Sequence, residues 1–394
     1  MPFDPELATK AWMATLNGAA RARSDAYFEG GYWLILWSAL AGIAADIVIL
    51  RLGWAAAISA RVQRFTQRRP LQSFLFAIPY ILLASLLVLP LTIYQGFFRE
   101  HAYGLLNQGF AAWAGQALTG LGISALAFAV LFAAVHAVIR RSPRGWWVGA
   151  TAVTIIGMAF FVAIAPLYIF PLFNSYEPLP DGPVRSAVLS MARANGVPAT
   201  DVFLVDASRQ SDRISANVAG LFGTTRIALN DNLMKQPVDE VRSVMAHELG
   251  HYVLNHIWKT LTAYALIAAI AFLAIARLLP LLLARFGPGW GVTSLDDPAI
   301  LPVISMIGAV IGLALTPVTN GITRTQEIEA DRFGLNVARA PESFASVAMK
   351  LSQYRKIEPG RWEEILFFDH PSGHTRVLTA MRWKAEHLDQ PDVR

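Results

Sequence analysis

The chain has 394 residues, of which 55% are hydrophobic and only 15% are charged, whereas about 25% of residues are charged in an ordinary soluble domain. This composition is typical of an integral membrane protein and argues against a soluble enzyme. The net charge of +5 includes no long basic run, so no nucleic-acid partner is expected. The absence of cysteine excludes disulfides, thiol nucleophiles and Cys-ligated metal sites.

Six apolar stretches are candidates for transmembrane helices. A span needs about 20 apolar residues, because each residue advances about 1.5 Å across roughly 30 Å of hydrocarbon. We predict spans at residues 31–50, 74–98, 117–139, 146–172, 261–283 and 300–316. A Gly- and Pro-rich segment at 286–289 predicts a turn that joins the last two spans into a hairpin. The first thirty residues mix charged and apolar positions, unlike a cleaved signal peptide.

These spans divide the chain into four regions. They are an N-terminal transmembrane region with four helices (1–174), a soluble region (175–260), a transmembrane hairpin (261–319) and a C-terminal soluble region (320–394). The first soluble region combines helix-like and strand-like patterns, which predict a small α+β unit. Because the hairpin makes one return trip across the bilayer, both soluble regions are expected on the same membrane face. They can therefore build one site.

The most specific motif is HELGH, from His247 to His251, which has the H-E-x-x-H arrangement. Residues four apart share one face of a helix, so both imidazoles can bind one zinc ion. The carboxylate of Glu248 can then accept a proton from the attacking water and pass it to the leaving amine. The alternative is a chance match on an amphipathic helix. Acidic residues at 239–240 and apolar flanks support a genuine helical motif.

A catalytic zinc requires a third protein ligand and one open position. We assign Glu327 as that ligand and Asp331, one helical turn later, as the residue that orients a histidine ligand. Glu329 is expected to point the opposite way. The alternative is a solvated helix in which these acids pair with Arg324 and Arg332.

These motifs resemble those of the membrane zinc metallopeptidases that include the type I CAAX prenyl proteases and the bacterial heat-shock protease HtpX. The resemblance rests on HELGHYVLNH (247–256), the E-x-x-A-D pattern (327–331) and HPSGHTR (370–376). The segment YQGFFREHAYGLLNQ (94–108) favours the CAAX prenyl protease branch. The resemblance implies a mainly α-helical fold, in which seven spans surround a chamber beside a small α+β unit of the gluzincin type. This chain shows about six spans.

The resemblance also implies the chemistry of the metal site. One Zn²⁺ per chain would bind His247, His251 and Glu327, with Glu248 as the general base. His256 follows His251 by five residues, and we interpret it as a residue that supports the site rather than as a ligand.

Three further residues are assigned to the substrate. The segment SDRISANVAGLFGTTRIAL (211–229) is similar to the family's substrate-binding edge strand, in which Asn217 would hold the substrate backbone. His370 matches a histidine that faces the substrate and could stabilise the oxyanion, and Arg376 of the same motif is assigned to substrate binding. The alternatives are a turn residue for Asn217 and a helix cap for His370.

We therefore predict a zinc metalloendopeptidase that cleaves near the carboxyl terminus of prenylated, CAAX-type peptides or other membrane-associated peptides. Its partners would be this substrate and the lipid bilayer, and no obligate protein partner is identifiable. One alternative is an HtpX-like quality-control protease of membrane proteins. Another is a noncatalytic scaffold or transporter whose structural zinc is closed by His256 or His370. The resemblance implies a cytosolic protease face, whereas the Arg-rich loops on the opposite side favour placing those loops inside.

Overall fold

The computed structural model describes residues 3–220, 223–391 and 393. Leu221 and Phe222, which belong to the predicted edge-strand segment, lie outside the described residues. Six described helices are long and apolar enough to cross a membrane, which confirms the predicted number. The six ranges are Gly18–Arg51 (α2), Arg69–Ala102, Phe110–Arg141 (α6), Trp146–Leu172, His256–Trp290 (α10) and Pro298–Ala338. In three of them the labelled α-helix is shorter than the range: α4 is Arg69–Ile93, α7 is Trp146–Ile164 and α11 is Leu301–Ala338.

The long helices expose apolar side chains on their outer faces. Large side chains more than 60% exposed include Leu118, Ile156, Phe160 and Leu266, which suits a hydrocarbon environment because the helical backbone satisfies its own polar groups. Inside the bundle, the Tyr80 hydroxyl donates a 2.6 Å hydrogen bond to Asp46, which is 2% exposed. A membrane-embedded carboxylate is expected to find such an interior partner.

The predicted turn at 286–289 is wrong. Helix α10 continues through Gly287 and Pro288 to Trp290, and the chain turns at Gly291, whose φ is 68°. Glycine ends a helix readily in this left-handed conformation. Gly287 has a different role, because a Cβ there would lie 2.3 Å from the Val292 carbonyl oxygen. The glycine therefore permits the close return of the chain after the turn.

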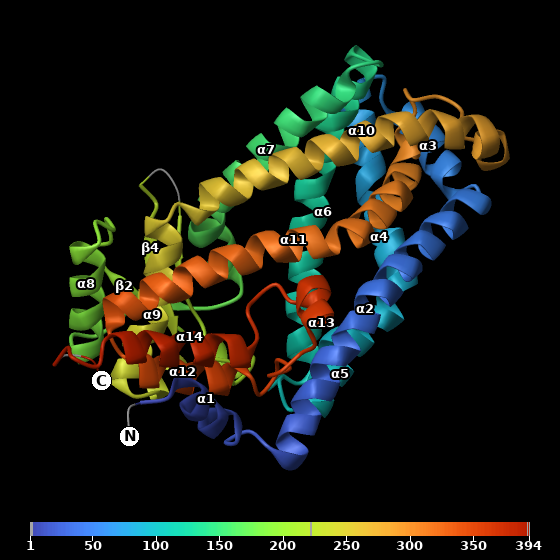
Figure 1. Ribbon diagram of the computed structural model, residues 1–394. Helices are drawn as coiled ribbons and strands as arrows, with labels where there is room; N and C mark the ends of the chain where they lie inside the picture. Colours follow the sequence, from blue (N-terminus) through green and yellow to red (C-terminus); the bar gives the residue numbers. More distant parts are fainter. Residues whose placement is uncertain (1–2, 221–222, 392, 394) are drawn as a thin grey trace.

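A small sheet and a group of shorter helices lie at one end of the molecule, where both chain termini also lie (Figure 1). The strand order is β1-β2-β4-β3. The central strands β2 (Val202–Val205) and β4 (Arg226–Asn230) are parallel. They are flanked by antiparallel β1 (Tyr176–Pro178) and β3 (Ala216–Ala219). In the described part of the chain, β3 is therefore an edge strand with one hydrogen-bonded neighbour.

Helix α9 (Val238–Val253) packs between this sheet and α11 (Figure 1). Val241, Met245 and Leu249 recur every four residues and are fully buried in a core shared with β4 and α8 (Pro183–Ala194). Burying one such side chain contributes about 1.5–3 kcal/mol. This apolar face fixes the rotation of α9, so that its histidines face α11.

Small residues allow α9 and α11 to approach closely. A Cβ at Gly334 of α11 would lie 3.1 Å from the backbone nitrogen of His247. A Cβ at Gly250 of α9 would lie 3.3 Å from Ala330 Cα. Larger side chains at either glycine would push the helices apart. Helix α11 is also continuous across the predicted boundary between residues 319 and 320, so one rigid helix links the membrane region to the site.

The remaining short helices are α1 (Pro5–Met13), α3 (Trp54–Phe65), α12 (Pro341–Leu351), α13 (Arg361–Phe367) and α14 (Gly373–Glu386). Helices α1, α12 and α14 share a third buried cluster. Glu240 of α9 accepts hydrogen bonds from Lys350 (2.6 Å) and Ser346 (2.8 Å) of α12. Helix α12 is thereby anchored to the helix that carries the HELGH motif.

Candidate active site

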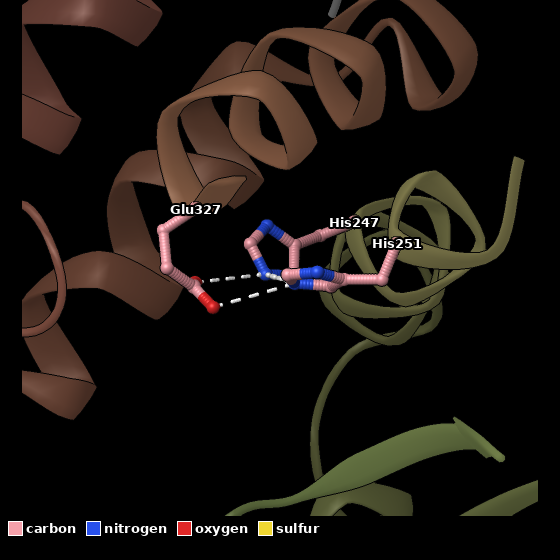
Figure 2. Close-up of side chains that lie close together, drawn as sticks. All are labelled: His247, His251 and Glu327. Carbon is pink, nitrogen blue, oxygen red and sulfur yellow. Dashed lines mark hydrogen bonds and ion pairs between the residues drawn. The ribbon is translucent and has the colours of Figure 1, made fainter. Parts of the chain in front are cut away.

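Three side chains from two helices converge at the contact of α9 and α11 (Figure 2). The Nε2 atoms of His247 and His251 are 3.1 Å apart. Glu327 Oε2 lies 3.3 Å from His247 Nε2, and its Oε1 lies 3.4 Å from His251 Nε2. Two ligand atoms that each lie about 2.0–2.1 Å from a tetrahedral ion are separated by about 3.3 Å. The three atoms are thus spaced as ligands of one metal ion.

The chemistry of these donors also suits zinc. Two imidazole nitrogens and one carboxylate are a ligand set that catalytic zinc sites use, with a fourth position left open. His247 and Glu327 are 8% and 7% exposed, so the site is largely shielded from solvent. Burial alone would lower the pKa of His247, but Asp331 and Glu327 raise it to about 10 in the absence of a cation. The concentrated negative charge therefore favours a bound cation.

Asp331 and Arg376 support His247 from behind. Asp331 Oδ1 lies 2.8 Å from His247 Nδ1, although the N–H direction is poorly aligned with the oxygen. Arg376 of α14 donates from both Nε (3.0 Å) and Nη2 to the two Asp331 oxygens. This paired contact fixes the carboxylate, and the carboxylate in turn orients the imidazole.

Two further side chains, His256 and Glu329, support His251. His256 Nδ1 lies 2.8 Å from His251 Nδ1, and His256 Nε2 lies 3.0 Å from Glu329. If His251 Nε2 binds a metal, its Nδ1–H donates to His256, and His256 then donates to Glu329. Glu329 also accepts a hydrogen bond from Lys259. As expected, Glu329 does not share the face of Glu327, yet it contributes to the site through His256.

This arrangement predicts that His256→Ala lowers zinc affinity by about 10- to 100-fold, because His251 loses the partner that fixes its ring. Competition with a fluorescent zinc chelator measures the change. His387→Ala is the matched control, since His387 stacks on Trp383 away from these contacts. Equal zinc affinity in the two variants would contradict a supporting role for His256.

Glu248 faces a cavity of about 270 Å³ that the two histidines and Glu327 also line. Burial raises the pKa of its carboxyl, whereas His247 and His251 lower it. Among the described residues, none forms a hydrogen bond or ion pair with Glu248. Its carboxylate is therefore available to a water molecule in the cavity, as a general base requires.

His370 reaches the same cavity from the loop before α14. Its Nε2 lies 3.4 Å from Glu327, and its Nδ1 lies 2.8 Å from Asp369. Arg324 of α11 holds this loop by donating to the carbonyl of Phe368 and, at 2.8 Å, to that of Glu364. Ser372 caps α14, so the alternative of a helix cap at His370 does not describe the structure.

Asn217 and Arg376 are the two other residues that the sequence interpretation assigns to the substrate. Asn217 lies in the edge strand opposite Ala228. The neighbouring Ala216 and Val218 pack against the core beside α9, so side-chain alternation directs Asn217 to the other face of the sheet. Arg376 lines the cavity but is 8% exposed and paired with Asp331. Their substrate-binding roles stay predictions.

The sequence interpretation missed one wall of the cavity. It is formed by Phe344, Val347 and Leu351 of α12 and by Tyr354 and Arg355 in the loop that follows. The helical spacing of the apolar residues predicts a buried face and could have revealed the first three. No sequence signal marks Tyr354 or Arg355.

Two family profiles match this chain and together cover most of its length. The profile of peptidase family M48 matches residues 178–384. The profile described as CAAX prenyl protease N-terminal, five membrane helices, matches residues 10–175, where the structure describes four of the six long apolar helices.

Individual proteins show the same relationship. The chain is 28% identical over 350 residues to the uncharacterized metalloprotease YhfN of Bacillus subtilis, which covers 87% of this chain and 81% of that protein. It is 28% identical over 295 residues to a CAAX prenyl protease 1 homolog of Oryza sativa, which covers 72% and 67% of the two chains. The crystal structure of S. mikatae Ste24p superposes with a TM-score of 0.78 at 20% identity, covering 92% of this chain and 89% of that one. This last match establishes the fold.

Proposed function

The chain belongs to peptidase family M48 and is a membrane metalloprotease, and from this premise we propose that it cleaves near the carboxyl terminus of prenylated, CAAX-type peptides. The observation that carries the proposal is the shared cavity of His247, His251, Glu327 and Glu248. The substrate class is supported by relatives named CAAX prenyl protease 1, among them those of Oryza sativa and Saccharomyces cerevisiae.

We assign the metal site to His247, His251 and Glu327, which would hold one Zn²⁺. When bound, the ion would act as a Lewis acid that polarises the substrate carbonyl and acidifies water. Asp331 and His256 would keep the two imidazoles in their ligating tautomers through the contacts described above.

Glu248 and His370 would act on the reacting atoms. Glu248 takes a proton as the water oxygen bonds to the scissile carbonyl carbon, and it returns this proton to the departing nitrogen as the C–N bond breaks. His370 donates from Nε2 to the carbonyl oxygen, where negative charge develops. The substrate lies extended along β3, whose outer edge has no paired strand among the described residues and can accept an added strand.

The position of the site suits a membrane-tethered substrate. Glu327 lies in α11, a long apolar helix, and α10 begins at His256, five residues after the metal-binding His251. The catalytic groups are therefore held where the long helices meet the soluble end (Figure 1). Following the family resemblance, we place this end in the cytosol.

The test is hydrolysis of a farnesylated carboxyl-terminal peptide by the zinc-loaded full chain in detergent, compared with the unmodified peptide and an unfolded protein substrate. We expect the farnesylated peptide to be cut near its carboxyl terminus with the highest kcat/KM. Faster hydrolysis of the unfolded protein at many positions would instead favour the quality-control function. Cleavage of none of the three by zinc-loaded protein would contradict the proposal.

A further inference from the structure

The cavity contains two guanidinium groups in different electrostatic situations. That of Arg376 is neutralised by the Asp331 carboxylate. That of Arg355 forms no hydrogen bond or ion pair with any residue in the described part of the chain, and it lines the cavity with Glu248 and His370. Because arginine stays charged at physiological pH, Arg355 presents a positive charge without a directly bonded partner to the space beside the catalytic groups.

The acidic side chains near Arg355 pair with other residues. The charges of Asp369 and Glu327 act on Arg355. Both carboxylates are already paired, Asp369 with His370 and Glu327 with the two metal-binding histidines. Arg355 is partly buried, and this burial lowers the pKa of its guanidinium. A desolvated and unpaired cation is costly, and an incoming anion would offset that cost.

The direction of the substrate places its carboxyl-terminal part beside Arg355. Residues 214–216, at the start of β3, line the cavity that contains Arg355. Val218 near the end of β3 and Gly220 just after it line a second cavity of about 400 Å³, which His251 also lines. Antiparallel pairing is the more stable arrangement of two strands. A peptide paired antiparallel to β3 therefore runs from the second cavity to the first, and its leaving segment enters the first.

We propose that Arg355 binds the free α-carboxylate at the end of the substrate and so selects cleavage sites close to a chain terminus. This inference rests on the proposed function and adds the residue that recognises the carboxyl terminus of the substrate. A guanidinium and a carboxylate form two parallel charge-assisted hydrogen bonds, and such geometry is specific for the planar anion. A terminal amide lacks the charge and one acceptor, so it binds more weakly.

The test compares three farnesylated peptides of one sequence: the free acid, the terminal amide, and an amide that ends in glutamate. We expect the wild-type enzyme to prefer the free acid by about 10- to 100-fold in kcat/KM, mainly through KM. Arg355→Gln should bring the acid-to-amide ratio close to 1, chiefly by raising KM for the free acid. Arg361→Gln is the matched control, because Arg361 is exposed at the start of α13.

The ratio is measured within one protein preparation, so a loss of folded protein cannot produce the expected result. An unchanged preference in Arg355→Gln, the absence of a preference in wild type, or equal use of the glutamate amide would overturn the inference. Measuring the same ratio on unmodified peptides separates the two hypotheses. If the free-acid preference depends on Arg355 there but farnesylation has no effect, the carboxylate receptor stands and the prenyl specificity fails.

Discussion

Glu248→Gln is expected to lower kcat for peptide hydrolysis by about 100- to 10,000-fold, the usual contribution of a positioned general acid or base, while the zinc content stays unchanged. Glutamine has the same shape but cannot accept a proton from water. Glu248 lines the cavity without a hydrogen-bonded or ion-paired partner among the described residues, so the substitution breaks no such bond there. Substrate binding should therefore persist, and the effect should appear in kcat rather than in KM.

The measurement combines metal analysis with steady-state kinetics on the farnesylated peptide. Glu177→Gln is the control, because Glu177 is an exposed residue of β1 far along the chain from the motif. This experiment also tests the rival model of a noncatalytic protein with structural zinc. In that model Glu248 has no role, and neither wild type nor variant would cut any peptide. A variant that retains wild-type kcat would remove Glu248 from the mechanism.

The membrane fold could be predicted largely because the bilayer imposes one length on every span. All six apolar stretches became helices, but the helices extend beyond the hydrocarbon-length windows: α11 runs to Ala338 and carries Glu327. The wrong turn at 286–289 shows the limit of a local rule. Gly287 and Pro288 are compatible with the last helical turn, and the choice of Gly291 as the end depends on how the chain folds back at Val292.

The candidate site was accessible to sequence reasoning where helical spacing determines proximity. His247 and His251 are four residues apart, as are Glu327 and Asp331, so each pair must share a helix face. Sequence spacing cannot show that two helices meet. That contact depends on small residues such as Gly334, whose missing side chain admits the backbone of His247.

The cavity wall shows a second limit of prediction from sequence. Arg355 lies outside regular secondary structure, and its sequence neighbours do not distinguish it from a solvated surface cation. Its unpaired state in the cavity arises only because the acids around it are engaged by other side chains. Partner choice among charged residues is a tertiary property, and no local pattern predicts it.

Glu327→Gln is expected to abolish both metal retention and hydrolysis, which separates its role from that of Glu248. The carboxylate contributes the only formal negative charge in the group His247, His251 and Glu327, and a neutral amide would leave a dication with neutral ligands in a buried site. Loss of a supporting partner already costs about 10- to 100-fold in metal affinity, so loss of a ligand should exceed about 100-fold.

The control for this variant is Glu329→Gln, the same change two residues along the same helix, where the side chain reaches His256 and Lys259 instead of the metal-binding atoms. Zinc content is measured after exchange against a chelator, and activity is measured over a range of added zinc concentrations. Zinc content should fall severely in Glu327→Gln and less in Glu329→Gln. Partial recovery of Glu327→Gln at high zinc would fit a weakened three-ligand site. Unchanged zinc affinity in Glu327→Gln would mean that the third ligand lies elsewhere, and His370, 3.4 Å from the same carboxylate, would be the next residue to replace.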